Sequence, residues 1–298
     1  MRSFEGYVFI TKMVLVTGAG GQVGKHLLKA LSAKRISTRA WIHRKRNEEA
    51  VVEADATEVY VGDLLSDEDM MEAMKGIDTV YYICNAANPN EDEIGLRLIN
   101  IAKREGNITF IYHSVMHALL CDMPHHKRKQ SVEKNLVDSG LPYVILQPAV
   151  FVQMLAPGIQ SVKSGGPFFQ KFYTSDHTKM SFVDINDYAE SAAEIIAGGS
   201  FVYGTYELCS EGAYSLYDLE QTLSELTGRR VTSAFISDAN FLETAHMDGN
   251  SYAGQTLLAM FRHYNHQGFC GNAFTMTQIL GRKPVTVKEY FQELLKSE

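Results

Sequence analysis

Short apolar runs rich in β-branched residues alternate with stretches of helical periodicity over the first half of the chain. The runs predicted as strands are residues 13–17, 37–42, 58–61, 79–84, 108–113 and 143–146. The stretches predicted as helices are residues 24–33, 67–74, 94–104 and 130–138, and Ser66 and Asp69 are expected to form a capping box before the second of these. Strands this uniformly apolar, separated by helices, are typical of a parallel sheet covered on both faces. We therefore predict an α/β fold built on a doubly wound parallel sheet.

The rhythm changes after residue 148, where a second and smaller unit is expected. Residues 153–179 are predicted to be mainly loop because the segment Ser-Gly-Gly-Pro at 164–167 interrupts them. Further helices are expected at residues 187–196 and 216–226 and at the C-terminus, with a strand at 205–209. We predict a large domain at residues 1–152 and a smaller α+β domain at 153–298, which passes a late strand to the sheet.

A glycine-rich turn follows the first predicted strand and leads directly into a helix. Gly18 permits a tight turn, Gly21 lets a pyrophosphate approach the backbone, and Gly24 brings the helix close to the sheet. Unpaired N–H groups at the helix start supply an anion site. The residues expected to contact a dinucleotide here are Gly18, Gly20, Gly21, Gln22, Val23 and Gly24. Ordinary turns also use glycines, but the strand–turn–helix context favours a dinucleotide site of the Rossmann type.

The residues after the second strand indicate which dinucleotide binds. A site for NAD places an Asp or Glu about 20 residues beyond the turn, where it bonds the ribose 2′-hydroxyl. This chain has the basic run His-Arg-Lys-Arg at 43–46 in that place. The Arg44 guanidinium can pair with a 2′-phosphate, which an acid would repel. The sequence therefore favours NADP(H), with NAD(H) as the alternative, although a solvated basic loop would explain the run without any ligand.

Further residues follow the third, fourth and fifth strands, at the edge of the sheet where ligands of this fold bind. Asp63 is expected either to bond the adenine amino group or to cap the turn. Asn85 and Ala86 follow the fourth strand and are expected to face the dinucleotide. Cys84 is expected either beside the nicotinamide or as a small buried apolar residue. Ser114 is expected either to orient a substrate or to cap a turn.

Many short segments together resemble the NmrA-like family of atypical short-chain dehydrogenases/reductases, over nearly the whole chain. The segments that carry the resemblance are residues 17–24, Arg44, 62–64, 113–115, 125–129, 132–133, 139–141, 145–149 and 183–187, with 261–264, 268–272 and 280–282 in the C-terminal part. The resemblance implies a Rossmann fold and adds Leu64, Gln147 and Pro148 to the expected cofactor contacts. Some members of this group are NADPH-dependent reductases, and others resemble dinucleotide-sensing regulators without chemistry.

The acid–base residues of ordinary short-chain dehydrogenases are missing from this chain. Those enzymes use Tyr-x-x-x-Lys, and none of the 15 tyrosines here has a lysine four residues later. His125-x-x-x-Lys129 occupies the matching place. The resemblance implies that Lys129 holds the nicotinamide ribose, and an imidazole at His125 can donate or accept a proton near pH 7. Both are candidate catalytic residues, although a solvated helix start would have the same sequence.

Four residues of metal-ligand type recur at a spacing of four, at His113, His117, Cys121 and His125. On one continuous helix they would align like metal ligands. His113 is predicted to end a strand, however, and Pro124 interrupts any helix before His125. We therefore expect no metal site.

Composition narrows the class of partner. The chain has 298 residues with 28 Lys and Arg against 35 Asp and Glu, a formal net charge of −7, so direct nucleic-acid binding is not expected. No stretch approaches the roughly 20 apolar residues of a membrane span. Four scattered cysteines without a CxxC pair suit a reducing cytoplasm. Residues 1–12 lack the apolar core of a signal peptide and are expected to be an N-terminal extension.

These inferences together predict an NADP(H)-dependent oxidoreductase. The expected reaction transfers a hydride between the nicotinamide and a small apolar molecule of aromatic or quinone-like structure, with Lys129 as cofactor anchor and His125 as acid. The alternative is a redox sensor that binds NADP(H) without catalysis and acts through a protein partner. A closed pocket beside the nicotinamide position would favour the enzyme.

Overall fold

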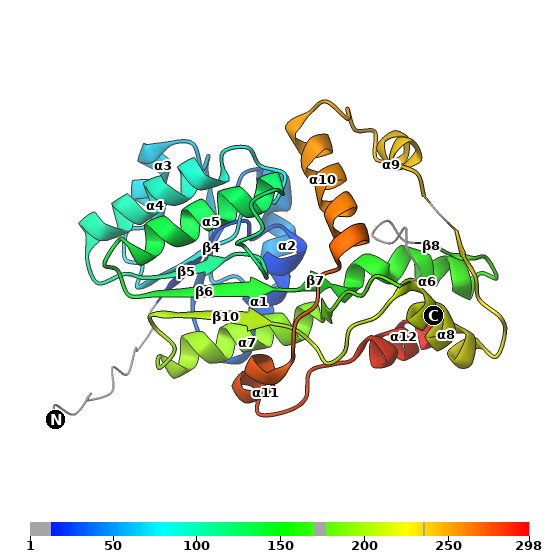
Figure 1. The fold of residues 1–298 in the computed structure, drawn as a ribbon. Coiled ribbons are helices and arrows are strands. Elements are labelled where there is room, and N and C mark those ends of the chain that lie inside the picture. The colour runs from blue at the N-terminus through cyan, green and yellow to red at the C-terminus, as the bar shows by residue number, and fades with distance from the viewer. Residues whose placement is uncertain (1–12, 170–176, 235, 298) are drawn as a thin grey trace, which may run out of the picture.

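The protein is built as a central sheet between two layers of helices, with a smaller unit at one end (Figure 1). The computed structural model describes residues 13–169, 177–234 and 236–297, so the expected extension at 1–12 lies outside the described residues. The strands are β1 (Val14–Val16), β2 (Thr38–Ile42), β3 (Glu58–Val61), β4 (Thr79–Tyr82), β5 (Thr109–His113), β6 (Tyr143–Pro148), β7 (Val150–Phe151), β8 (Phe168–Phe169), β9 (Phe182–Val183), β10 (Gly204–Leu208) and β11 (Ser233–Ala234). The helices are α1 (Gln22–Ala33), α2 (Glu48–Val52), α3 (Asp67–Ala73), α4 (Glu91–Glu105), α5 (Pro124–Val137), α6 (Ala156–Lys163), α7 (Ile185–Gly198), α8 (Leu216–Thr227), α9 (Asp238–Thr244), α10 (Tyr252–Gln267), α11 (Phe274–Leu280) and α12 (Val287–Lys296), with 3₁₀ helices at Lys45–Asn47 and Val152–Leu155.

Seven parallel strands form the central sheet in the order β10-β6-β5-β4-β1-β2-β3. The chain moves outward from β1 through β2 to β3, then returns to the other side of β1 for β4 and continues to β5, β6 and β10. The direction reverses between β1 and β4, so the carboxyl ends of these two strands flank the crevice where ligands bind in this fold. The prediction of a doubly wound parallel sheet is confirmed, and β10 is the expected late strand.

The two faces of the sheet bury separate apolar clusters. Helices α3, α4 and α5 lie on one face, and α1 and α7 pack together on the other (Figure 1). Because successive side chains of a strand point to opposite faces, Tyr81 joins the cluster under α1 and α7, whereas Tyr82 joins the cluster under α4. Neighbouring residues at the end of β4 therefore belong to the apolar clusters on opposite faces of the sheet.

The smaller unit lies beyond the carboxyl ends of the central strands. Figure 1 shows α6, α8 and α12 gathered there, with α10 standing beside the start of α5. Two short parallel pairs, β8 with β11 and β7 with β9, belong to this end of the molecule. The Arg128 Nε on α5 donates to the Tyr252 hydroxyl at the start of α10, at 2.8 Å. This contact joins α10 to the helix that carries the predicted catalytic residues.

Three local predictions were wrong in detail. Ser66 accepts from the Asp69 N–H, but the Asp69 carboxylate accepts from the Asp63 N–H at 2.8 Å, so the capping box is only half formed. Residues 152–163 are helical rather than loop, because Pro157 fits the first turn of α6 and apolar residues follow at helical spacing. Helix α5 begins at Pro124 rather than at residue 130, since proline is tolerated at the first helical position.

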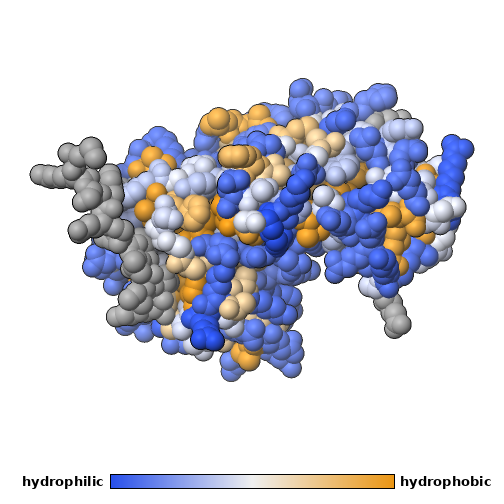
Figure 2. Space-filling model, turned by 90° about the horizontal axis from the view of Figure 1, so that it is seen from below, coloured by the Kyte–Doolittle hydropathy of each residue, from blue (hydrophilic) through white to orange (hydrophobic). Residues whose placement is uncertain are grey.

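One face of the molecule carries mainly polar side chains (Figure 2). Seen from below, hydrophilic residues cover most of the molecule and hydrophobic ones form separate patches between them (Figure 2). Among the described residues, no helix has the length and apolar character needed to cross a membrane.

Candidate active site

The turn after β1 leaves the amino end of α1 open. Gly21 is the N-cap residue, and no side chain caps the helix there. The Gly21 N–H donates to the Gly18 carbonyl at 3.0 Å, and Gly18 has a φ of +60°. A Cβ at Gly24 would lie 2.6 Å from the Cα of Ala19, so only glycine fits without moving the backbone. The other residues expected here, Gly20, Gln22 and Val23, are partly or fully exposed on the same turn. This cradle fits a dinucleotide pyrophosphate.

The basic run after β2 lies beside this turn. A Cβ added to Gly20 would lie 3.0 Å from the Asn47 side-chain nitrogen, which places the 3₁₀ helix after β2 next to the glycines. Arg44, Lys45 and Arg46 are exposed, and none of the ion pairs found among the described residues involves them. The Arg44 guanidinium is therefore free to meet an anion near the glycine-rich turn.

The segment after β3 supports the turn-capping alternative for Asp63. Its Oδ1 accepts from the Leu65 N–H at 2.9 Å, and its own N–H donates to the Asp69 carboxylate. Asp63 is exposed, so its second carboxylate oxygen still faces solvent at this edge. Leu64 is half-buried and packs against the apolar cluster on the α4 side of the sheet.

The segment after β4 is held by side-chain turns. Asn85 Oδ1 accepts from the Ala87 N–H at 2.8 Å, and Asn88 donates to the Cys84 sulfur at 3.4 Å. Burial raises the pKa of the Cys84 thiol to about 11, so the thiol is protonated at neutral pH. Cys84 and Ala86 both line the cavity described below, which keeps Cys84 near the predicted nicotinamide position but without a thiolate.

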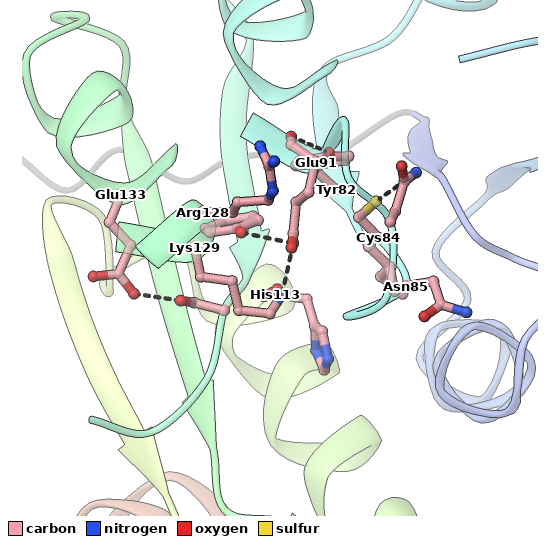
Figure 3. Close-up of polar contacts among 12 residues, drawn as sticks. Tyr82, Cys84, Asn85, Glu91, His113, Arg128, Lys129 and Glu133 are labelled. Atoms are coloured by element: carbon pink, nitrogen blue, oxygen red, sulfur yellow. Dashed lines mark hydrogen bonds and ion pairs between the residues drawn. The ribbon is translucent and has the colours of Figure 1, made fainter. Parts of the chain in front are cut away.

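Lys129 points from α5 toward the start of α4, where it meets a buried carboxylate (Figure 3). Its Nζ donates to Glu91 Oε1 at 2.7 Å and to the His113 carbonyl at 3.2 Å. The Tyr112 hydroxyl donates to the same Glu91 oxygen at 2.9 Å, and Glu91 is 0% exposed. Burial raises the pKa of Glu91, while the charge of Lys129 and the two hydrogen bonds act in the opposite direction. Because an ammonium has three donors, one N–H of Lys129 remains for a ribose hydroxyl.

A half-buried carboxylate, Glu133, ties together two predicted cofactor contacts. The Ser114 hydroxyl donates to Glu133 Oε1, and Gln147 Nε2 donates to the same oxygen at 2.7 Å. The Ser114 proton is thereby committed, so its oxygen can act only as an acceptor toward a ligand. Gln147 and Pro148 end β6, and Pro148 lines the cavity with Ser114.

A cavity of about 190 Å³ lies where β4, β5 and β6 end. Its polar lining includes His113, Ser114, His125 and Lys129. Its apolar lining includes Phe151, Met154 and, from α10, Met260. The predicted catalytic pair and several apolar side chains therefore face one partly open pocket.

A larger hollow of about 790 Å³ between α5 and the start of α10 is not the candidate site. Arg128 lines it and is already paired with Asp92 at 2.6 Å and with the Tyr252 hydroxyl. None of the predicted site residues lines this hollow.

His125 lies in the first turn of α5 and is almost fully buried. Its Nδ1 has no hydrogen-bond partner among the described residues. Burial lowers the pKa of His125 to about 2, and the neighbouring His126 and Lys129 act in the same direction. The expectation that this imidazole changes charge near pH 7 is therefore wrong, because the ring is neutral there. A neutral ring can still donate a hydrogen bond to a substrate oxygen.

Buried neutral histidines predict a loss of stability in mild acid. Burial lowers the pKa of His125 to about 2 and that of His126 to about 4, and it lowers the pKa of His113 well below 6.5. The unfolded chain binds protons at these residues near pH 6.5 and the native protein does not, so stability is full above that pH and falls as pH decreases. We expect His125 and His126 each to cost about 2 kcal/mol at pH 5 relative to pH 7, and His113 to act in the same direction.

Urea unfolding at the two pH values measures this loss. The variant His125→Gln/His126→Gln should show a shallower dependence of the unfolding free energy on pH. A dependence as steep as that of the unmodified protein would contradict the assignment.

Two residues of the site were not predicted from the sequence. Glu91 stands in an acidic first helical turn of a kind that is usually solvated, and its burial depends on Lys129 arriving from α5. His113 was considered as the end of a strand, as part of the family resemblance and in the rejected metal pattern, but not as a site residue, yet it lines the cavity and its Nδ1 hydrogen bonds to Tyr188. The signal for both residues was their position in the sequence near the carboxyl ends of strands. Only the tertiary structure shows that they lie close to the other site residues.

The described residues contain no group of three or more side chains that could hold a metal ion. His113 ends β5 and His125 lies in α5, so the regular spacing in the sequence does not correspond to one helix face.

The sheet topology and the glycine-rich turn define a dinucleotide-binding protein of the Rossmann type. The chain belongs to the NmrA-like family, whose sequence profile matches residues 10–291, as predicted.

Similar proteins include two curated relatives and a solved structure. Quinone oxidoreductase 2 of Escherichia coli (strain K12) is 25% identical over 233 residues, which cover 77% of this chain and 79% of that protein. NAD(P)H azoreductase of Xenophilus azovorans is 23% identical over 228 residues, covering 74% and 75%. The crystal structure of an NADPH-dependent quinone oxidoreductase from Escherichia coli, complexed with NADPH, matches with a TM-score of 0.80 at 22% identity, over 95% of this chain and 100% of that chain.

Proposed function

We propose that the protein is an NADP(H)-dependent oxidoreductase that reduces a small quinone-like or aromatic molecule. The observation that carries the proposal is the cavity at the ends of β4, β5 and β6, which joins Lys129 and His125 to the apolar Phe151 and Met260. Apolar walls with a few polar groups are typical of a site for a planar organic substrate. The names of the similar proteins, a quinone oxidoreductase and an azoreductase, support the same class of substrate.

The residues present fit a nicotinamide dinucleotide. The open amino end of α1 would hold the pyrophosphate, Arg44 the 2′-phosphate, and Lys129 the nicotinamide ribose. When bound, the reduced nicotinamide supplies the hydride. Glu91 offsets the charge of Lys129, so the cation can be buried beside the cavity without an unpaired charge.

The pocket at the ends of β4, β5 and β6 supports the enzyme over the sensor that the sequence left as an alternative. A sensor needs no space for a second small molecule, whereas this space is lined by side chains of both the sheet and α10. The four cysteines in the described part of the protein are all free thiols. Free thiols support a reducing cytoplasm as the place of the reaction.

An assay of NADPH oxidation against a series of quinones and aromatic ketones tests the proposal. We expect oxidation that depends on the quinone and on the protein. NADPH binding without oxidation by any member of the series would contradict the enzyme and favour the sensor.

Arg44→Ala is expected to remove most of the preference for NADPH over NADH. A charge-assisted contact to phosphate contributes about 1–3 kcal/mol, which corresponds to about 5- to 150-fold in affinity. Titration of each dinucleotide by calorimetry measures the preference, and Arg46→Ala in the same exposed run is the matched control. Equal affinities for NADPH and NADH in the unmodified protein would rule out this role for Arg44.

A further inference from the structure

A chain of buried hydrogen bonds ends at His113. The hydroxyls of Tyr81 on β4 and Tyr188 on α7 lie 2.9 Å apart, and the Tyr188 hydroxyl bonds to Nδ1 of His113. Tyr81 and Tyr188 are both 0% exposed, and His113 is buried at the end of β5. The chain thus runs from the core between the sheet and α7 to the wall of the cavity.

The direction of this chain follows from the donors available. The Tyr81 hydroxyl has no partner other than Tyr188 in the described part of the chain. A buried hydroxyl that does not donate its proton is costly, so Tyr81 donates to Tyr188. Tyr188 in turn donates to Nδ1 of His113. An imidazole that accepts at Nδ1 carries its proton on Nε2, and burial keeps the ring neutral by lowering its pKa.

The Nε2 atom of His113 is not fully buried, and the residue lines the cavity. The ring packs parallel to Phe151, with an interplanar angle of 3°, and edge-on to Tyr188, so its plane is fixed on two sides. Nδ1 is occupied by Tyr188, and His113 lines the cavity together with Lys129 and His125. Its backbone carbonyl also accepts from Lys129 Nζ, which holds the residue next to the proposed ribose anchor.

The geometry points to His113 as a catalytic residue whose Nε2–H donates a hydrogen bond to the substrate oxygen that gains negative charge. Tyr188 and Tyr81 are positioning residues that fix this tautomer of His113. The inference rests on the proposed function. It adds a hydrogen-bond donor at His113 to the one that the neutral ring of His125 can supply. A substrate with a carbonyl group, such as a quinone, fits this donor.

The chemistry requires no proton from His113. The hydride and its electron pair pass from the reduced nicotinamide to the substrate, so the dinucleotide is oxidised and the substrate is reduced. The electron pair of the carbonyl bond moves to the oxygen, where the Nε2–H stabilises the developing charge. Water then protonates the oxygen. Loss of the Nε2 proton would leave an anion on a buried ring, which is why a donor role fits His113 better than an acid role.

Nitrogen-15 NMR of histidine-labelled protein, without any ligand, tests the tautomer. The His113 signals are assigned by their loss in His113→Gln. We expect a protonated Nε2 and an unprotonated Nδ1 at pH 7, and a mixture of tautomers in Tyr188→Phe. A protonated Nδ1 in the unmodified protein would overturn the proposal whether or not the protein reduces a quinone.

Kinetics test the role in catalysis. His113→Phe keeps an aromatic ring against Phe151 and should lower kcat by about 10²- to 10³-fold, the effect of losing one donor to a developing oxyanion, with the KM for NADPH within about twofold. Tyr188→Phe should lower kcat by about 3- to 10-fold, the effect of one net hydrogen bond. An unchanged kcat in His113→Phe would overturn the donor role.

The double variant Tyr81→Phe/Tyr188→Phe separates positioning from stability. It removes the hydroxyl of Tyr81 that Tyr188→Phe leaves unpaired, so the thermal midpoint should recover. We expect kcat to stay low, because Nδ1 still lacks its donor. A kcat that recovers together with stability would show that the tyrosines are only structural. If the unmodified protein reduces no substrate, the proposed function fails and the donor role with it, while the NMR result on the tautomer stands by itself.

Discussion

Replacing Lys129 with methionine is expected to lower the free energy of unfolding by about 3–5 kcal/mol, the range found when one partner of a buried ion pair is removed. Glu91 would keep its carboxylate in a place that is 0% exposed, where the Tyr112 hydroxyl is the remaining side-chain partner among the described residues. The change also removes the N–H proposed to hold the ribose, so NADPH should bind more weakly. Urea unfolding and calorimetric titration measure the two effects separately.

The double variant Glu91→Gln/Lys129→Met distinguishes the ion pair from the ribose contact. Glutamine can still accept from Tyr112 without carrying a charge, so we expect stability to return to within about 1–2 kcal/mol of the unmodified protein. The affinity for NADPH should stay low because the cation is still missing. An affinity that recovers with stability would contradict the role of Lys129 as the ribose anchor.

The stability lost in Lys129→Met should depend on pH. Burial raises the pKa of Glu91, and the variant lacks the cation that opposes this shift. The native variant then binds a proton at Glu91 over a pH range in which the unfolded chain has lost it, so its stability decreases as pH rises. The difference in unfolding free energy between variant and unmodified protein should therefore be larger at pH 8 than at pH 5. The buried histidines act in the same direction, because loss of Lys129 also removes a charge that lowers their pKa and so reduces the stability lost in acid.

The order of strands and helices in the first half of the chain could be predicted because each strand is a short, continuous apolar run. Residues 143–146, for example, were expected as a strand and lie within β6. The helix at Ala156–Lys163 was missed because the segment Ser-Gly-Gly-Pro at 164–167 suggested a loop. Helix α6 packs against β8 and α12, and no local pattern reports these contacts.

The dinucleotide cradle could be predicted because its function depends on backbone geometry, and glycine is a local signal for that geometry. The surroundings of the proposed chemistry could not. The neutral state of His125 depends on burial at the start of α5, which α10 contacts from more than 120 residues later in the chain. The tautomer of His113 depends on Tyr188, which is 75 residues away in sequence. Charge state and hydrogen-bond direction are properties of the assembled core. The sequence pattern therefore identifies the residue types at this site but not their protonation states.

Replacing Gly21 with valine is expected to weaken NADPH binding by at least about 100-fold, or about 2.7 kcal/mol. Gly21 is exposed at the N-cap of α1, where the backbone N–H groups must approach the pyrophosphate closely. A branched side chain on this surface would stand between the phosphate and those groups. The free protein should lose little stability, because an added Cβ would have one near neighbour, the Gly18 carbonyl at 3.2 Å.

Gly198→Val is the matched control, since Gly198 ends α7 away from the turn and a Cβ there makes ordinary contact with Phe201 at 3.6 Å. Its affinity for NADPH should equal that of the unmodified protein. The thermal midpoint without ligand should be nearly the same for both variants, whereas added NADPH should raise it only in the control. A Gly21→Val protein that is stabilised by NADPH as strongly as the control would show that the pyrophosphate does not bind at the amino end of α1.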